Sequence, residues 1–164
     1  MSAKELDNEI ALVTGASRGI GLAIALELGR QGATVIGTAT SNGGAGKIGE
    51  ALKAQGIQGQ GLVLNVTDQG SIDTALTEIQ SAWGAPSILV NNAGITRDNL
   101  LMRMKDEEWD EILDTNLKSI FRMSKAVVRG MTKARKGRII SISSIVGSSG
   151  NPGQCNYAAA KAGV

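Results

Sequence analysis

Short apolar runs rich in β-branched residues recur along the chain, and most are followed by glycine, serine, threonine or asparagine. Such runs, bounded by turn residues, predict β-strands. We expect five strands, over residues 10–14, 34–38, 61–65, 88–92 and 138–143. The runs are almost continuously apolar rather than alternating, which is typical of parallel strands that helices cover on both faces.

Between these runs the apolar residues follow a helical spacing, which predicts amphipathic helices. The expected core-facing positions are Ile20, Ile24 and Leu28; then Ile72, Leu76, Ile79 and Trp83; then Ile112, Leu113, Leu117, Ile120, Phe121 and Val128. The last group lies in a long helix over about residues 105–136, which has more than one apolar stripe. Asp68 or Ser71 is the expected N-cap of the second helix.

Strands that alternate with helices predict an α/β fold with a doubly wound, Rossmann-like parallel sheet. The expected strands begin at residues 10, 34, 61, 88 and 138. The first three intervals each accommodate one helix with its loops, and the last accommodates a long helix or two. With 164 residues and no recognisable linker, residues 1–164 are expected to form a single domain.

Composition excludes several classes of function. Apolar residues make up 42% and charged residues 20% of the chain, as in ordinary soluble proteins, and the net charge of +2 gives no argument for nucleic-acid binding. The chain has no histidine and one cysteine, Cys155, so we expect no zinc site and no intrachain disulfide. No apolar run is long enough to span a membrane, and the charged N-terminus does not resemble a secretory signal.

The first expected strand runs into the sequence T-G-A-S-R-G-I-G, with glycines at positions 15, 19 and 21. Glycines between a strand and a helix permit a tight turn and let a pyrophosphate approach the backbone. The helix N-terminus then offers free N–H groups and the positive end of its dipole. The loop therefore predicts dinucleotide binding, although an ordinary strand-to-helix turn would also use glycine.

The sequence N-Y-A-A-A-K places Tyr157 and Lys161 four residues apart, so on a helix they share one face. A free tyrosine phenol has a pKa of about 10. An ammonium about 4 Å away favours the phenolate by roughly 4 kcal/mol at an effective dielectric constant of about 20. The pair is a candidate proton donor in a chain without histidine, and an ordinary amphipathic contact is the alternative interpretation.

The G-x-x-x-G-x-G spacing, the N-N-A-G sequence over residues 91–94, and the Tyr/Lys pair together resemble the short-chain dehydrogenase/reductase family. The resemblance implies four catalytic residues, Asn116, Ser144, Tyr157 and Lys161. Tyr157 would protonate the substrate oxygen, Ser144 would hydrogen-bond it, and Lys161 would support the tyrosine and bind the nicotinamide ribose. Asn116 would anchor a water that relays protons to Lys161, or it is only a kink residue inside a helix.

Ser144 is chosen among several neighbouring serines because it lies thirteen residues before Tyr157, as the family pattern requires. Residues 38–41 contain no acidic side chain that would bind a ribose 2′-hydroxyl, whereas Arg18 and the hydroxyls of Thr38 and Thr40 suit a 2′-phosphate. The expected cofactor is therefore NADP(H). Its expected ligands are Gly15, Ser17, Arg18, Gly19, Ile20, Gly21, Thr40, Asn65, Val66, Asn92, Tyr157 and Lys161.

Residues 91–109 are similar to the branch of this family that reduces 3-oxoacyl groups on acyl carrier protein in bacterial fatty-acid synthesis. That similarity implies a cytoplasmic, homotetrameric, NADPH-dependent reductase. Acyl carrier protein would dock on the basic segment around Arg129 and Arg135, unless that segment is only a solvated helix face. A reductase of another carbonyl, such as a 3-oxoacyl-CoA, and a non-catalytic nucleotide-binding fragment remain alternatives. Family members continue beyond the Tyr/Lys helix, so we expect the C-terminal part of the family fold to be missing after Val164.

Overall fold

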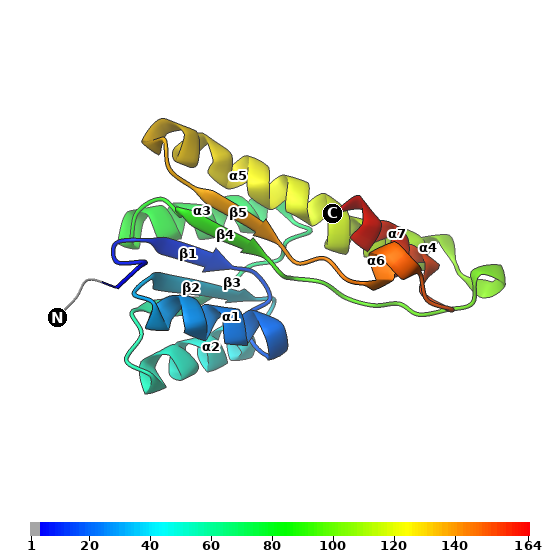
Figure 1. Ribbon diagram of the computed structural model, residues 1–164, viewed down its shortest axis with the longest axis horizontal. Helices are drawn as coiled ribbons and strands as arrows, with labels where there is room; N and C mark the ends of the chain where they lie inside the picture. Colours follow the sequence, from blue (N-terminus) through cyan, green and yellow to red (C-terminus); the bar gives the residue numbers. More distant parts are fainter. Residues whose placement is uncertain (1–3) are drawn as a thin grey trace.

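A five-stranded parallel sheet forms the centre of the protein, which we describe from a computed structural model covering residues 4–164. The strands are β1 (Ile10–Val13), β2 (Thr34–Ala39), β3 (Gly59–Val63), β4 (Ile88–Asn91) and β5 (Arg138–Ser141). Their order is β3-β2-β1-β4-β5, and all neighbours run parallel (Figure 1). The predicted doubly wound α/β sheet is confirmed, and the crossover between β1 and β4 creates a crevice at the carboxyl ends of these strands.

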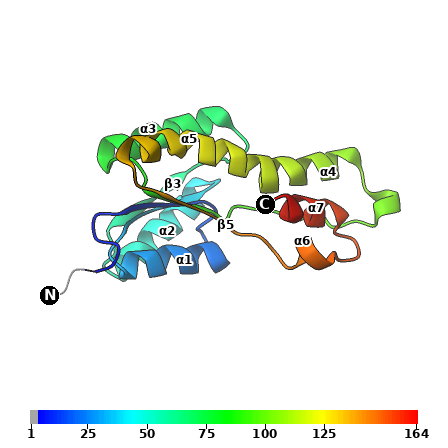
Figure 2. The ribbon, with the colours of Figure 1, turned by 45° about the horizontal axis from the view of Figure 1, so that its top comes forward.

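Helices cover both faces of this sheet. The helices are α1 (Gly19–Arg30), α2 (Asn42–Ala54), α3 (Gln69–Ala82), α4 (Asp106–Leu113), α5 (Ser119–Ala134), α6 (Val146–Ser149) and α7 (Cys155–Gly163). Figure 2 shows α1 and α2 on one side of the sheet and α3 and α5 on the other. Two apolar clusters fill the layers, one built around Val13, Val35 and Ile48 and the other around Leu12, Ile72 and Met123.

The segment between β4 and α4 extends away from the sheet and contains the short helix η1 (Leu101–Arg103). Helices α6 and α7 lie beside this extension in both ribbon views (Figures 1 and 2). Helix α7 packs against both α4 and α6. The extension and α7 therefore form one unit at the carboxyl edge of the sheet, next to the crevice.

The buried face of α1 differs from the expected one. Gly21, Ala25 and Gly29 are buried, whereas Ile20 is 64% exposed. A Cβ atom at Gly29 would lie 2.2 Å from the Ile57 side chain, so only glycine permits this close approach. Ile24 packs partly against the core, but the prediction for Ile20 was wrong, because small residues rather than large ones form the contact face of this helix.

The expected long helix consists of α4 and α5, joined by a π-helical segment, η2 (Asp114–Lys118). Ile112 is fully buried, as predicted. In α5, however, the buried stripe is Met123, Val127 and Met131, whereas the expected core residues Phe121 and Val128 are 61% and 45% exposed. That part of the prediction was wrong: the helix carries two apolar faces, and only packing against the sheet selects one.

Of the two residues predicted as the N-cap of α3, Asp68 takes that position, and its carboxylate accepts a hydrogen bond from the Gly70 N–H at 2.8 Å. Ser71, the alternative cap, accepts instead from the Asn65 N–H at 2.9 Å. Ile72, Leu76 and Ile79 are buried beneath the sheet, as their spacing predicted. This helix follows its sequence pattern because only one of its faces is apolar.

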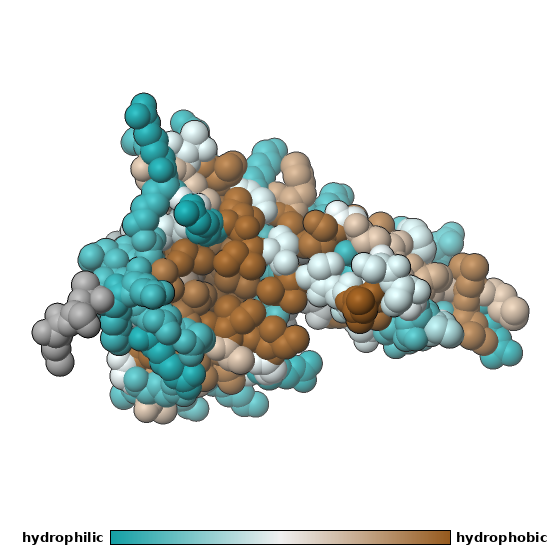
Figure 3. Space-filling view, in the orientation of Figure 1, coloured by the Kyte–Doolittle hydropathy of each residue, from teal (hydrophilic) through white to brown (hydrophobic). Residues whose placement is uncertain are grey.

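The edge of the sheet at β5 is partly exposed to solvent. Figure 3 shows apolar surface gathered over the middle of the molecule, where β5 lies in Figure 1. On this edge strand, Ile139 and Ile140 are 41% and 45% exposed. Over residues 4–164, none of the helices is both long enough and apolar enough to cross a bilayer.

Candidate functional site

A cleft of about 770 Å³ opens at the carboxyl ends of the first four strands. The loops after β1, β2, β3 and β4 all contribute to its walls. Ten of the residues expected to bind the cofactor lie on it: Gly15, Ser17, Arg18, Gly19, Ile20, Gly21, Thr40, Asn65, Val66 and Asn92. The exposed Ile20 side chain is explained by this location, because it faces the cleft rather than the core.

The glycine loop has the geometry of a phosphate-binding turn. Gly15 has φ of +64°, and a Cβ atom at Gly21 would lie 2.3 Å from the Gly15 carbonyl oxygen. At Gly19, with φ of +57°, a Cβ atom would meet nothing within 4 Å. The first turn of α1 contains no acidic residue, and Arg18 makes no side-chain cap. Free N–H groups and space above the glycines therefore fit an anionic pyrophosphate.

Thr14 ties the glycine loop to the N-N-A-G segment, a role that the sequence analysis missed. Its side chain is 1% exposed, and Oγ1 accepts hydrogen bonds from the N–H groups of Asn92 and Ala93 at 3.1 and 3.0 Å. Asn92 in turn donates from Nδ2 to the carbonyl oxygens of Thr14 and Gly15, both at 3.0 Å. A hydroxyl residue at the end of an apolar run was the signal that could have revealed Thr14.

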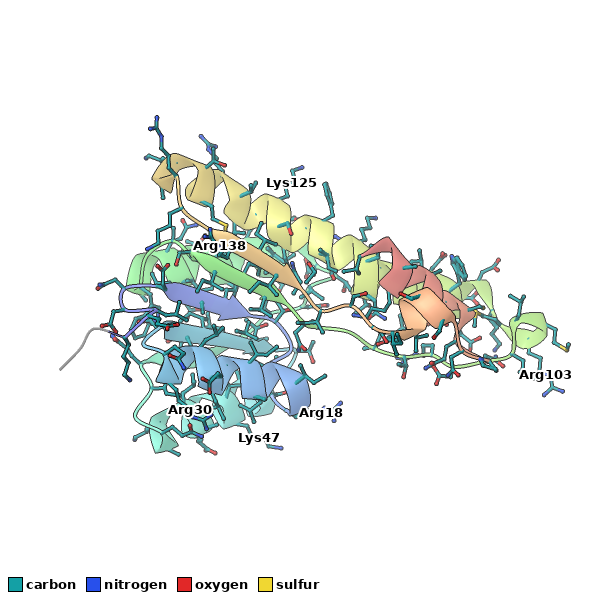
Figure 4. The ribbon with its side chains drawn as sticks, viewed as in Figure 1. Arg18, Arg30, Lys47, Arg103, Lys125 and Arg138 are labelled. Atoms are coloured by element: carbon teal, nitrogen blue, oxygen red, sulfur yellow. The ribbon has the colours of Figure 1, made fainter. Side chains whose placement is uncertain are left out.

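The two threonine hydroxyls expected near a 2′-phosphate differ in their exposure to the cleft. Thr38 is 1% exposed inside β2 and does not line the cleft, so that expectation was wrong. Thr40 is exposed and lines it, as does Ser41, whose Oγ accepts from the Gly44 N–H at 3.1 Å and caps α2. Figure 4 shows Arg18 projecting from the start of α1, so the guanidinium is free to meet a ligand.

A second pocket, of about 540 Å³, adjoins this cleft and contains Ser144, Tyr157 and Lys161. The two hollows share the lining residues Arg18, Ile20, Asn92, Gly94 and Ile95. A molecule that lies along the cleft can therefore reach into the pocket. The geometry brings together three of the four expected catalytic residues at the end of the dinucleotide cleft.

Lys161 faces Tyr157 from the next turn of α7. The Lys161 ammonium lies 5.9 Å from the centre of the Tyr157 ring and donates to the Ile142 carbonyl at 2.7 Å. The residue is only 7% exposed, and this burial lowers the pKa of Lys161 from its usual value. The ammonium and the phenol therefore lie close together at the wall of the pocket.

The serines of the β5–α6 loop are distinguished by their hydrogen bonds. Ser143 and Ser144 line the pocket, whereas Ser141, Ser148 and Ser149 do not. The Ser143 hydroxyl donates to the Lys161 carbonyl at 2.8 Å. Ser144 Oγ accepts from the Val146 N–H at 3.2 Å, which leaves its hydroxyl hydrogen available to a ligand. Ser144 is thus the serine of this loop that can donate into the pocket.

Asn116 lies outside both hollows, in the π-helical segment η2, and is 1% exposed. Its Oδ1 accepts from the Ile95 N–H and its Nδ2 donates to the Ile95 carbonyl, both at 2.8 Å. The side-chain amide therefore holds the segment after β4 in place.

The described residues 4–164 include no group of three or more histidine, cysteine, aspartate or glutamate side chains arranged to hold a metal ion. The polar groups around the expected catalytic position are instead the Ser144 hydroxyl, the Tyr157 phenol and the Lys161 ammonium. Their arrangement suits proton transfer to an oxygen atom that gains negative charge.

Comparison with known proteins gives the same family. A family model described as short chain dehydrogenase matches residues 9–164. The chain is 66% identical over 159 residues to a 3-oxoacyl-[acyl-carrier-protein] reductase of Pseudomonas aeruginosa and, over the same length, to one of Vibrio harveyi; each match covers 97% of the chain. The corresponding Escherichia coli enzyme is 63% identical over 158 residues, or 96% of the chain. The chain spans 64% of the length of each of these relatives. From its sheet, its glycine loop and this match, the chain belongs to the short chain dehydrogenase family.

Proposed function

We propose that the protein reduces 3-oxoacyl groups carried on acyl carrier protein to 3-hydroxyacyl groups, with NADPH as the cofactor. The observation that carries the proposal is the position of Tyr157 and Lys161, in a pocket that shares five lining residues with the dinucleotide cleft. The relatives at 62–66% identity are named for this reaction. Their similarity supports the substrate, which the pocket geometry alone leaves open.

The bound reduced nicotinamide supplies the hydride for the substrate carbonyl carbon. The chain's own residues act on the carbonyl oxygen. Tyr157 donates its phenolic proton to that oxygen, and Ser144 donates a hydrogen bond to the same atom. Lys161 stabilises the resulting phenolate through its nearby ammonium, which lies 5.9 Å from the ring centre. Asn116 acts at a distance, by holding Ile95 at the junction of cleft and pocket.

The preference for NADPH over NADH follows from the charges around the adenosine end of the cleft. Arg18, Thr40 and Ser41 line the cleft, and residues 40–49 after β2 contain no carboxylate. A 2′-phosphate meets a cation and hydroxyl donors there, whereas the acidic residue that binds a free ribose 2′-hydroxyl in other dinucleotide folds is missing.

Arg129 and Arg135 are the proposed docking residues for the acidic carrier protein. Both lie toward the C-terminal end of α5 or just beyond it, whereas η2 and Asn116 precede its N-terminus. At 1.5 Å per residue, Arg129 is about 20 Å along the helix from Asn116. A carrier docked there therefore presents its acyl group through an extended arm, or presents it to the pocket of a neighbouring subunit.

A homotetramer belongs to the same proposal. Trp109, Phe121 and Val128 leave apolar surface exposed on α4 and α5, which suits burial against a second copy. A cytoplasmic location is also proposed, because the single cysteine, Cys155, is unpaired and suits a reducing compartment.

The proposal is tested by following NADPH absorbance with a 3-oxoacyl group on acyl carrier protein. The full-length protein should consume NADPH, and Tyr157→Phe should lose turnover while it still binds the cofactor, because only the proton donor is removed. Ser148→Ala, a serine outside the pocket, is the control and should remain active. Near-normal turnover by Tyr157→Phe would contradict the assigned acid, and no turnover by the unaltered protein would contradict the function.

A further inference from the structure

Asn156 directly precedes Tyr157 in α7, and it is completely buried, with 0% of its surface exposed. It lines neither the cleft nor the pocket. Burying a side-chain amide costs free energy unless its polar atoms are hydrogen-bonded. The partners of this amide therefore indicate what it contributes.

Both polar atoms of the amide are hydrogen-bonded, and its nitrogen joins separate segments. Nδ2 donates to the Arg97 carbonyl at 3.0 Å and to the Glu108 carbonyl at 3.2 Å. Oδ1 accepts from the N–H of Tyr157 at 2.8 Å. Arg97 lies after β4 and lines the pocket, whereas Glu108 lies in α4. One side chain thus connects the pocket wall, α4 and the beginning of α7.

The start of α7 depends on this connection. The N-cap residue, Gln154, makes no side-chain hydrogen bond to the helix. The N–H of Tyr157 is one of the first-turn groups that have no intrahelical partner, and Asn156 satisfies it. Near the other end of the Tyr157–Lys161 pair, Ser143 holds the Lys161 carbonyl at 2.8 Å. The helix is therefore held at one point beside each of the two side chains.

We infer that Asn156 is a positioning residue that fixes the first turn of α7, and so holds the Tyr157 phenol beside Lys161 and Ser144. The inference rests on the proposed reductase function and deepens it. Asn156 itself lines neither the cofactor cleft nor the pocket, so it acts on the reaction by placing Tyr157. Without it, the first turn of α7 can shift while Lys161 stays held by the Ile142 carbonyl and by Ser143, so the phenol moves away from the ammonium.

Two consequences follow from such a movement. A displacement of about 1 Å at a reacting group can lower a rate by about 100-fold. A phenolate farther from the Lys161 ammonium is also less stabilised, so it forms only at higher pH. Binding of NADPH should be unaffected, because the glycine loop and the β2–α2 loop are held by other contacts.

The test uses Asn156→Asp and Asn156→Ser in the full-length protein. Asn156→Asp keeps the shape and the acceptor but removes both donors and directs a carboxylate at two carbonyl oxygens. If it does not fold, Asn156→Ser, which is small and uncharged, carries the test. The control is Asn99→Ala, because Asn99 donates within the same region, to the Arg103 carbonyl at 3.1 Å and to the Glu108 carboxylate.

Three quantities are measured: the Kd for NADPH, kcat with a 3-oxoacyl thioester, and tyrosinate ultraviolet absorbance against pH. Subtracting the titration of Tyr157→Phe from that of each protein isolates the signal of Tyr157, the one tyrosine among the 164 residues of the sequence. We expect an unchanged Kd, a kcat lowered by about 100-fold, and a phenolate that forms at higher pH in the Asn156 variants. Asn99→Ala should match the parent in all three.

Other results would overturn the inference. A kcat loss with an equal loss of NADPH affinity would show a general structural role, and an unchanged tyrosinate titration would show that Asn156 does not place the phenol. The titration needs no turnover. It therefore tests Asn156 even if the parent protein fails to reduce the thioester, a failure that would overturn the proposed function instead.

Discussion

At the scale of single residues, the candidate site depends on which hydrogen bonds each polar side chain already makes within the protein. Ser143 and Ser144 are adjacent and both reach the pocket, yet only Ser144 keeps a free hydroxyl hydrogen. Thr38 and Thr40 are two residues apart on β2 and the loop after it, yet one is buried and the other lines the cleft. Residue type and position in the chain suggested the candidates, and local pairing distinguishes among them.

Arg18 allows the cofactor preference to be tested. We expect Arg18→Ala to weaken NADPH binding by about 10-fold or more and to change NADH binding little, because a charge-assisted contact to the 2′-phosphate is worth about 1.5–3 kcal/mol. The Kd values are measured by quenching of protein fluorescence on titration with each cofactor. Lys47→Ala removes another exposed cation, on the neighbouring helix α2, and should affect both cofactors little (Figure 4). An equal loss of both affinities in Arg18→Ala would contradict the preference.

At the scale of elements, small residues decide how closely a helix approaches its neighbours. Helix α1 places Gly21 against the Gly15 carbonyl and Gly29 against Ile57. The predicted apolar stripe of this helix included Ile20, because hydrophobic periodicity gives weight to large side chains and none to glycine. The strand and helix positions followed well from local pattern, whereas the contact face of α1 depended on the neighbouring loop.

Two glycines in helices make a matched pair for testing this close approach. In Gly21→Ala the new Cβ would meet the Gly15 carbonyl oxygen at 2.3 Å, so the glycine loop must shift and NADPH affinity should fall. In Gly46→Ala, within α2, the new Cβ meets nothing within 4 Å. That change should leave affinity intact and raise the free energy of unfolding by about 0.5–1 kcal/mol.

Cofactor titration and urea denaturation of both variants provide the measurements. Unchanged NADPH affinity in Gly21→Ala would show that the loop tolerates the added methyl group. A destabilised Gly46→Ala would contradict the open environment assigned to that position.

At the scale of the whole molecule, a few contacts join segments that are far apart in sequence. The Glu9 carboxylate, just before β1, forms an ion pair with Lys136, just beyond α5, and accepts a hydrogen bond from the Ser87 hydroxyl. Burial raises the pKa of Glu9, but hydrogen bonds from Lys136 and Ser87 outweigh this effect, so the pKa is lower than its usual value of 4.5. The pair connects the amino end of the sheet to the end of α5.

The lowered pKa of Glu9 gives stability a defined pH dependence. The unfolded chain binds a proton at this carboxyl more readily than the folded chain does, so the stabilising contribution is full above pH 4.5 and is lost as the pH falls through the folded pKa. Glu9→Gln should therefore unfold more easily than the parent at neutral pH, and the difference should shrink in acid. Urea denaturation at a series of pH values measures this, and a difference independent of pH would refute the linkage.

Carrier docking also belongs to the whole molecule, because it would connect the end of α5 with a pocket at the other end of the helix. Arg129→Glu with Arg135→Glu should raise KM for the carrier-bound substrate and weaken its salt dependence, because charge attraction is screened by salt. KM for a small 3-oxoacyl thioester should not change. Arg30→Glu with Lys47→Glu, on the far side of the sheet from α5, changes the net charge by the same amount and is the control (Figure 4). Equal effects on both substrates would contradict docking at these arginines.

The amino-acid sequence by itself determined the strands of this protein, and the positions along the chain of its glycine loop and of the Tyr157–Lys161 pair. The five strands, the glycine loop and the Tyr157–Lys161 spacing are properties of short segments, so periodicity, turn chemistry and helix geometry are sufficient to predict them. Tertiary structure alone decided which apolar face of α5 is buried and which serine is free to donate. It also decided which distant groups the amides of Asn116 and Asn156 bind, because these partners lie 21 to 59 residues away and meet the amides only when the chain packs.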